Sequence, residues 1–158
     1  LLGGFVIVAG GEVARFEPPD GLEAVVVVPR SAVRTAVARR ALPAVVPIAD
    51  AVANVAHGAL LALGLARGDP SLIGAGLHDR LHQPYRAHLF PHSMRLLERA
   101  PQLGAIGASF SGAGPTVLFW TQVDATGAVV RALRRETEGW AEVLRAPFEP
   151  QGADVREL

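Results

Sequence analysis

A glycine-rich segment at 111–116, with the sequence SGAGPT, contains the residues of this chain best suited to bind an anion. Gly112 and Gly114 accept positive φ at little cost, and the proline that follows keeps Gly114 out of the helical region. We expect the backbone N–H groups of Gly112, Ala113 and Gly114 to form a concave nest for a phosphate, with the Ser111 hydroxyl at its rim. The alternative is that the segment is only a hairpin connection.

The basic residues restrict how the chain could handle phosphate. All 15 basic residues are arginine, so a phosphate loop that depends on lysine is excluded. Phosphate chemistry here must use backbone amides, arginine or a metal ion.

Histidines are concentrated between residues 78 and 92. His78 and His82 are spaced i, i+4, which places two imidazoles on one helix face as in some zinc sites. No carboxylate accompanies them as in a His-Glu-x-x-His helix. We therefore expect surface or capping histidines and predict no metal site.

Composition indicates one globular domain over residues 1–158. Half of the residues are hydrophobic and the mean hydropathy is +0.30, enough to form a core. Fifteen acidic residues balance the basic ones, so no net charge attracts nucleic acid or an anionic membrane. The absence of cysteine excludes disulfides and thiol catalysis and favours a reducing, cytoplasmic location.

Several elements must position the glycine-rich segment. It lies between a run of small residues and a β-branched and aromatic run, which predicts a strand, a tight loop and a return strand over 104–121. Hydrophobic patterning predicts the remaining elements. These are a hairpin at 5–16, a central strand at 24–28, helices at 31–41, 47–66, 71–81, 93–100 and 124–138, a last strand at 143–148 and a polar tail at 152–158.

The helix at 47–66 is the longest, and its apolar residues recur at spacings of three, four and seven. This periodicity favours a buried helix at the centre of the core. Its charge-free part, 51–66, is shorter than a membrane span requires.

The order strand, helices, strand, strand, helix, strand predicts an α+β fold. It corresponds to a ferredoxin-like split β-α-β sandwich, with an antiparallel sheet and helices on one face.

Three segments resemble the GHMP small-molecule kinases. SGAGPT at 111–116 is similar to their third conserved motif, while TAVARRALP at 35–43 and DRLHQPYR at 79–86 resemble the homoserine kinases among them. The resemblance implies that residues 1–158 form a GHMP kinase C-terminal domain. It also implies that residues 1–23 are a connecting hairpin from an N-terminal domain missing from this chain.

The resemblance further implies ATP-dependent phosphorylation of the hydroxyl of L-homoserine, a step of threonine biosynthesis. Thr35, Arg39 and Arg86 match the substrate-binding positions, and a two-arginine clamp suits an amino-acid carboxylate because each guanidinium offers paired donors. Residues 111–114 match the phosphate loop. The nucleotide loop, the Mg²⁺ ligands and the catalytic groups would belong to the missing domain, so this chain alone is expected to be inactive. A homodimer is a further possibility.

Two alternatives remain. One is a different GHMP kinase that acts on another small alcohol. The other is a non-catalytic ferredoxin-like module for ligand binding or dimerisation.

Overall fold

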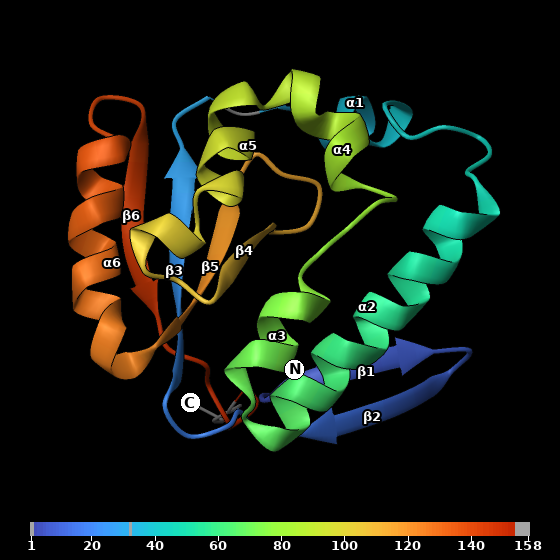
Figure 1. Ribbon diagram of the computed structural model, residues 1–158, viewed down its shortest axis with the longest axis horizontal. Coiled ribbons are helices and arrows are strands. Elements are labelled where there is room, and N and C mark those ends of the chain that lie inside the picture. The colour runs from blue at the N-terminus through green and yellow to red at the C-terminus, as the bar shows by residue number, and fades with distance from the viewer. Residues whose placement is uncertain (1, 32, 154–158) are drawn as a thin grey trace, which may run out of the picture.

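A four-stranded antiparallel sheet forms the centre of the fold (Figure 1). The computed structural model describes residues 2–31 and 33–153, so most of the polar tail predicted at 152–158 lies outside the described residues. The strands are ordered β4-β5-β3-β6. Their bounds are Leu22–Pro29 for β3, Gly107–Phe110 for β4, Val117–Gln122 for β5 and Ala141–Ala146 for β6.

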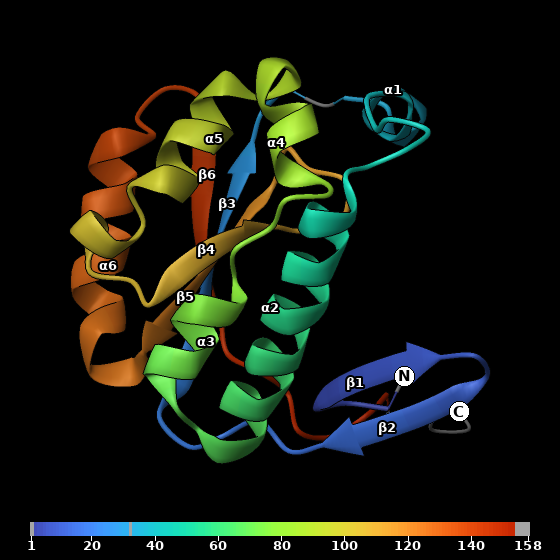
Figure 2. The ribbon, with the colours of Figure 1, turned by 45° about the vertical axis from the view of Figure 1, so that its right-hand side comes forward.

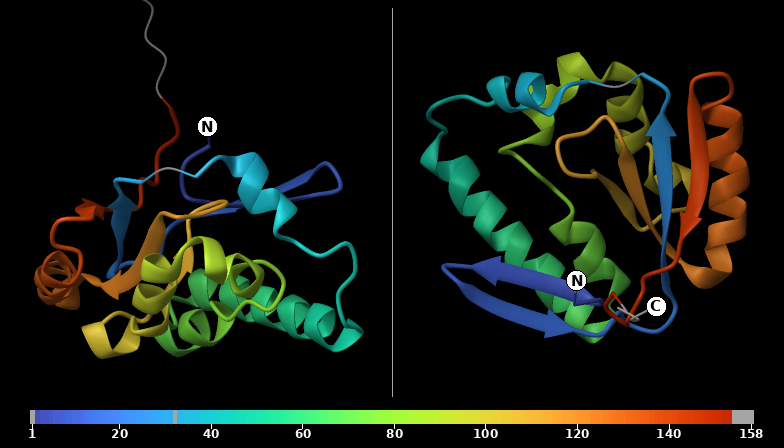
Figure 3. Two further views of the ribbon diagram at one scale, coloured as in Figure 1. Left: turned by 90° about the horizontal axis from the view of Figure 1, so that it is seen from above. Right: turned by 180° about the vertical axis from the view of Figure 1, so that it is seen from behind.

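The connections give this sheet its ferredoxin-like plan. A long helical crossover joins β3 to β4, β4 returns directly as β5, and one helix joins β5 to β6. All three strand pairs are antiparallel, and Val25 of β3 lies opposite Phe119 of β5 and Arg145 of β6. The larger helices lie on one side of the sheet (Figure 3). The predicted fold class is confirmed.

The helix predicted at 71–81 ends at Gly76, so His78 and His82 do not share a helix face, and the short helix at 83–86 was not predicted. The helices are α1 (Thr35–Arg40), α2 (Ile48–Arg67), α3 (Pro70–Gly76), α4 (Gln83–Arg86), α5 (Pro91–Glu98) and α6 (Val123–Glu136), with 3₁₀ turns at Ala87–Leu89 and Pro101–Leu103.

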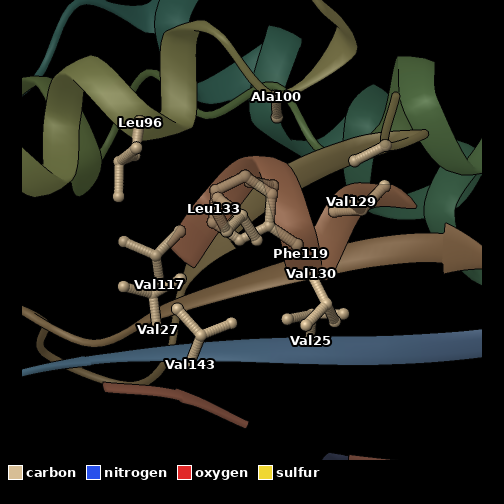
Figure 4. Close-up of a cluster of buried hydrophobic side chains, with 12 residues drawn as sticks. Val25, Val27, Leu96, Ala100, Val117, Phe119, Val129, Val130, Leu133 and Val143 are labelled. Atoms are coloured by element: carbon tan, nitrogen blue, oxygen red, sulfur yellow. The ribbon is translucent and has the colours of Figure 1, made fainter. Parts of the chain in front are cut away.

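The main core lies between the sheet and helices α5 and α6 (Figure 4). Because side chains alternate along a strand, Val117 and Phe119 of β5 point to the same face and are fully buried. Leu96 of α5 and Leu133 of α6 cover them from the helical layer. This packing fixes the two strands that flank the glycine-rich segment.

The predicted N-terminal hairpin is present and forms a separate two-stranded sheet. It pairs β1 (Phe5–Ala9) with β2 (Glu12–Phe16). Phe5 and Phe16 pack into a second cluster with Leu65 and Trp120, beside the C-terminal half of α2 (Figure 2). Its role as a connection to another domain stays a prediction.

Helix α2 does not lie at the centre of the core, so that prediction was wrong. Among its residues only Gly64 and Leu65 are buried, and its apolar side chains at Ile48, Val52 and Val55 are exposed. Periodicity identified the apolar face correctly but could not show that nothing in the described chain covers it. By length and composition α2 could cross a membrane, although one such helix is weak evidence for a span.

Close backbone contact joins α2 to α3. A Cβ placed on Gly76 would lie 2.4 Å from the Leu61 amide nitrogen, and one on Gly64 would lie 2.6 Å from the Ile73 amide nitrogen. Only glycine permits this approach. Asp69 caps α3 by accepting hydrogen bonds from two amides of its first turn.

Two other helices begin without a side-chain cap. Ser31 does not cap α1, which begins at Thr35 after Arg34 without a side-chain cap. Asp124 lies within the first turn of α6 because the helix follows β5 directly, with no intervening loop. Its carboxylate there still complements the positive end of the helix dipole.

Candidate active site

The glycine-rich segment joins β4 to β5 as a tight loop, here called the glycine loop (111–116). Gly112 and Gly114 adopt positive φ of 61° and 78°, and the bond from Gly114 to Pro115 is cis. A Cβ on Gly114 would lie 2.8 Å from the Phe90 ring. Ser93 of α5 donates a hydrogen bond of 2.7 Å to the Pro115 carbonyl. The loop is therefore shaped by its glycines and attached to α5.

The amides of the loop have different roles. Those of Ser111 and Gly114 donate to the carbonyls of Thr116 and Ser111, at 2.8 and 3.2 Å. The amides of Gly112 and Ala113 have no acceptor among the residues that the structure describes. The geometry thus differs from a three-amide nest, because Gly114 helps to close the turn and two amides remain for an anion.

Arg86 is the buried cation near the loop. It lies in α4 with 6% of its surface exposed, and its Nε donates a 3.1 Å hydrogen bond to the carbonyl oxygen of Ala38 in α1. The side chain therefore links α4 to the short helix α1. The partner that the structure shows for this side chain is a main-chain carbonyl.

Asp79 organises the segment that carries Arg86. Its carboxylate accepts hydrogen bonds from the amides of Leu81, His82 and Gln83 and from the Asn54 side chain, the last at 3.0 Å. Burial alone would raise the pKa of Asp79, but these donors outweigh it and the pKa lies below its usual value. The charged carboxylate is therefore fully hydrogen-bonded. Its bonds hold the segment between α3 and the first turn of α4.

Gln83 connects that segment to the glycine loop. Its amide donates to Asp79, while its side-chain Oε1 accepts a 2.9 Å hydrogen bond from the amide of Phe110, the last residue of β4. Gln83 is 7% exposed and lies three residues before Arg86, one turn of helix away. This side chain therefore sets the position of Arg86 relative to the start of the loop.

A cavity of about 440 Å³ brings these residues together. Its lining includes Asn54 of α2, Asp79, Gln83, Arg86 and Gly112. Arg86 and Gly112 thus face one space although they are far apart in the chain. A buried guanidinium and a free backbone amide on one cavity can hold an anion between them.

Thr35 and Arg39 lie on α1 and are exposed. Neither lines this cavity. Arg39 is nevertheless close to the site along the backbone, because it follows Ala38, whose carbonyl binds Arg86. The structure brings Arg86 and the glycine loop together, whereas convergence of Arg39 on the same anion stays a prediction.

The histidines do not gather around a metal position. The described residues contain no group of three or more histidine and acidic side chains placed for one ion. His82 lies 3.4 Å from Asp79 at the surface. The rings of His57 and His78 are 5.7 Å apart, on α2 and just after α3.

Sequence reasoning missed the positioning roles of Asp79 and Gln83. A signal for the first was present, because an aspartate a few residues before a proline in a first helical turn is typical of a side chain that caps backbone amides. No local signal shows that the Gln83 side chain bonds to residue 110, since that bond depends on tertiary packing.

The family described as "GHMP kinases C terminal" matches residues 60–138, which include Asp79, Gln83, Arg86 and the glycine loop. The chain belongs to this family. It therefore shares the carboxy-terminal domain of the GHMP kinases, as the sequence motifs predicted.

Relatives with homoserine kinase names are similar over almost the whole chain. Homoserine kinase of Synechococcus sp. (strain CC9605) is 40% identical over 152 residues, which is 93% of this chain and 48% of the relative. The crystal structure of homoserine kinase from Cytophaga hutchinsonii has a TM-score of 0.88 at 30% identity and covers 95% of this chain and 50% of that one. The chain thus spans about half the length of the relatives it matches.

A more distant structure shows the fold alone. L. major mevalonate kinase, solved in complex with R-mevalonate, has a TM-score of 0.64 at 16% identity. The same domain architecture therefore occurs in kinases whose names differ from those of the nearer relatives.

Proposed function

We propose that this chain is the substrate-side half of an ATP-dependent homoserine kinase, which phosphorylates the hydroxyl of L-homoserine in threonine biosynthesis. The observation that carries the proposal is the shared cavity of Arg86 and Gly112. It offers a cation for a substrate carboxylate and, at Gly112, a free amide for a phosphate. Names of relatives support homoserine as the substrate.

Phosphoryl transfer requires mainly positioning and charge stabilisation from the protein. In this proposal Arg86, with Arg39 and Thr35 from α1, binds the carboxylate end of homoserine. The amides of Gly112 and Ala113 bind phosphate oxygens of ATP while the bond between its β- and γ-phosphates breaks and the γ-phosphoryl group passes to the homoserine hydroxyl. The groups that accept the hydroxyl proton belong to the other half.

Magnesium is assigned to the other half as well. The described residues show no cluster of acidic and histidine side chains suited to a metal ion. We expect the chain alone to be inactive.

The test joins this chain to the amino-terminal half of the Synechococcus sp. (strain CC9605) homoserine kinase in one polypeptide. We expect ADP production that depends on homoserine from the joined polypeptide and none from this chain alone. Arg86→Ala should lower kcat/KM for homoserine by about 100-fold, because a charge-assisted carboxylate contact contributes about 1.5–3 kcal/mol. Arg131→Ala, an exposed arginine of α6, is the matched control.

Unchanged activity in Arg86→Ala would contradict the assigned role of the cavity. ADP production with another alcohol, such as mevalonate or galactose, and none with homoserine would favour the other GHMP kinase. No activity with any alcohol, in a folded joined polypeptide, would favour a non-catalytic module.

The cellular part of the proposal places the enzyme in the cytoplasm, in keeping with a chain free of cysteine. The joined polypeptide should rescue a threonine auxotroph that lacks homoserine kinase, which tests the pathway. Cell fractionation tests the location. Sedimentation equilibrium tests whether the protein forms a homodimer.

A further inference from the structure

Helix α2 carries a continuous apolar surface on the side that faces away from α3. Its members are spaced by three or four residues and are all exposed, and we call them the α2 stripe: Ile48, Val52, Val55, Ala59, Leu63 and Ala66. Ile48, Val52, Val55 and Leu63 are 80%, 62%, 76% and 45% exposed. The stripe therefore extends along the whole helix.

Such a surface is unusual for a chain that functions alone. Single exposed apolar residues are normal, but a contiguous patch of this kind marks an interaction site. The stretch 51–66 contains no charged residue, so no charged side chain favours the exposure of this surface to solvent. The opposite side of α2, with Leu61, Gly64 and Leu65, packs against α3 and the second cluster, so the stripe cannot turn inward.

The neighbouring hairpin is also incompletely covered. Val8 and Val13 lie opposite each other on β1 and β2 and are 67% and 54% exposed. Among the described residues β1 and β2 pair only with each other, which leaves two open strand edges. A two-stranded sheet of this kind is marginally stable alone and suits the addition of further strands. The hairpin lies alongside the C-terminal half of α2 in Figures 1 and 2.

The lengths of the relatives identify the occupant. This chain matches about half of each, and the matched family is the carboxy-terminal one, so the relatives contain an amino-terminal half of similar size. In such a polypeptide that half joins this chain beside the hairpin. A short tether gives it an effective concentration on the order of millimolar, far above that of a free second copy.

We infer that the α2 stripe is the docking surface for the amino-terminal half of a GHMP kinase chain, which presents an apolar face to α2 and extends the sheet of the hairpin. The inference rests on the proposed function. It adds the specific surface, which the site residues do not define, because the cavity with Arg86 involves a different side of α2 at Asn54 and Gly58.

The absence of cysteine makes a direct test possible, because a single thiol can report on one position. Val55→Cys places the thiol at the middle of the stripe, and Arg131→Cys is the control on exposed α6. Each variant is made in this chain alone and in the joined polypeptide with the Synechococcus amino-terminal half. Maleimide labelling of the named position is followed by mass spectrometry.

We expect Val55→Cys to be labelled rapidly in this chain alone at low concentration and at least about tenfold more slowly in the joined polypeptide, since docking restricts access to open states. Arg131→Cys should be labelled equally in both. Equal, rapid labelling of Val55→Cys in both polypeptides would overturn the inference. Protection in this chain alone that increases with its concentration would assign the stripe to a second copy instead.

A charge variant supplies a second, independent measurement. Val52→Asp is expected to leave the thermal unfolding of this chain alone unchanged, because residue 52 is exposed. In the joined polypeptide it should restore labelling at Val55→Cys to within about threefold of the rate in this chain alone, because an unpaired charge disfavours an apolar interface. Protection that persists in the double variant would contradict docking at the stripe.

The two proposals fail separately. Homoserine-dependent ADP production with an unprotected Val55→Cys would refute the docking surface and leave the function intact. Protection of Val55→Cys without homoserine-dependent ADP production would refute the proposed function and leave the docking surface intact.

Discussion

Helices α6 and α2 both repeat apolar residues at spacings of three and four but have opposite environments. In α6, Val129, Val130 and Leu133 are buried against the sheet. In α2, the residues of the stripe are largely exposed. A periodic pattern therefore locates the apolar face of a helix but not its environment. Helix α6 completes a core within this chain, whereas the apolar stripe of α2 stays exposed among the described residues.

The largest expected effect comes from truncating equivalent leucines of the two helices in this chain alone. Leu133→Ala should lower the free energy of unfolding by about 2–5 kcal/mol, because Leu133 is fully buried in the main core. Leu63→Ala, in the stripe, should change it by less than about 0.5 kcal/mol. Urea unfolding measures both, and equal losses would remove the contrast between the helices.

The contact between α2 and α3 gives the next largest effect. Gly76→Ala should destabilise the chain by about 1–3 kcal/mol, because the new Cβ would meet the backbone of Leu61. The matched control is Gly58→Ala on α2, where a Cβ meets nothing within 4 Å. The higher helix propensity of alanine should raise the free energy of unfolding there by as much as about 1 kcal/mol. Thermal unfolding of both variants measures this. A neutral Gly76→Ala would show that α2 is held by other contacts.

Gln83 offers a prediction about the site. Gln83→Leu removes the acceptor for the half-buried amide of Phe110 and should cost about 1–2 kcal/mol of stability. In the joined polypeptide it should also raise KM for homoserine, because Arg86 loses its fixed distance from the glycine loop. Gln102→Leu, at an exposed position, is the control. A loss of stability with unchanged kinetics would make Gln83 a purely structural residue.

The smallest effect concerns pH. Hydrogen bonds from Arg145 hold the pKa of Glu23 below its ordinary 4.5, although burial opposes them. The folded chain therefore keeps this carboxylate charged where the unfolded chain binds a proton. The resulting stabilisation is complete above pH 4.5 and decreases as pH falls toward the lower, folded pKa.

Glu23→Gln should therefore reduce the loss of stability on acidification, by no more than about 1 kcal/mol. Urea unfolding at a series of pH values measures this difference, and Glu142→Gln on β6 provides an exposed control. An unchanged pH dependence in Glu23→Gln would indicate that other carboxylates, such as Asp79, dominate acid unfolding.

Much of the fold was predictable because local patterns and tertiary structure agree. The alternation of Val117 and Phe119, and the glycines between two strand-like runs, identified β4, the glycine loop and β5. The environment of α2 was not predictable, since periodicity does not show that its apolar stripe stays exposed among the described residues. Helix starts at Thr35 and Val123 were misjudged because no side chain caps them.

The site was predictable only in part. Residue types and motif resemblance selected Arg86 and the glycine loop, which share a cavity in the structure. The bond from Arg86 to Ala38, 48 residues away, has no local sequence signal. The engagement of the Gly114 amide within the loop also could not be read from residue types, because it depends on the turn geometry.

The hydrogen bond from Arg86 to the Ala38 carbonyl has an entropic consequence. A free arginine side chain samples many rotamers, and a ligand that immobilises it loses about 0.5–1.5 kcal/mol of binding free energy. In this chain the Nε–H is already restrained by α1 before any ligand arrives. An anion that enters the cavity therefore binds a side chain that is already ordered. The entropic cost of ordering this arginine lowers the stability of the fold and not the affinity for the anion.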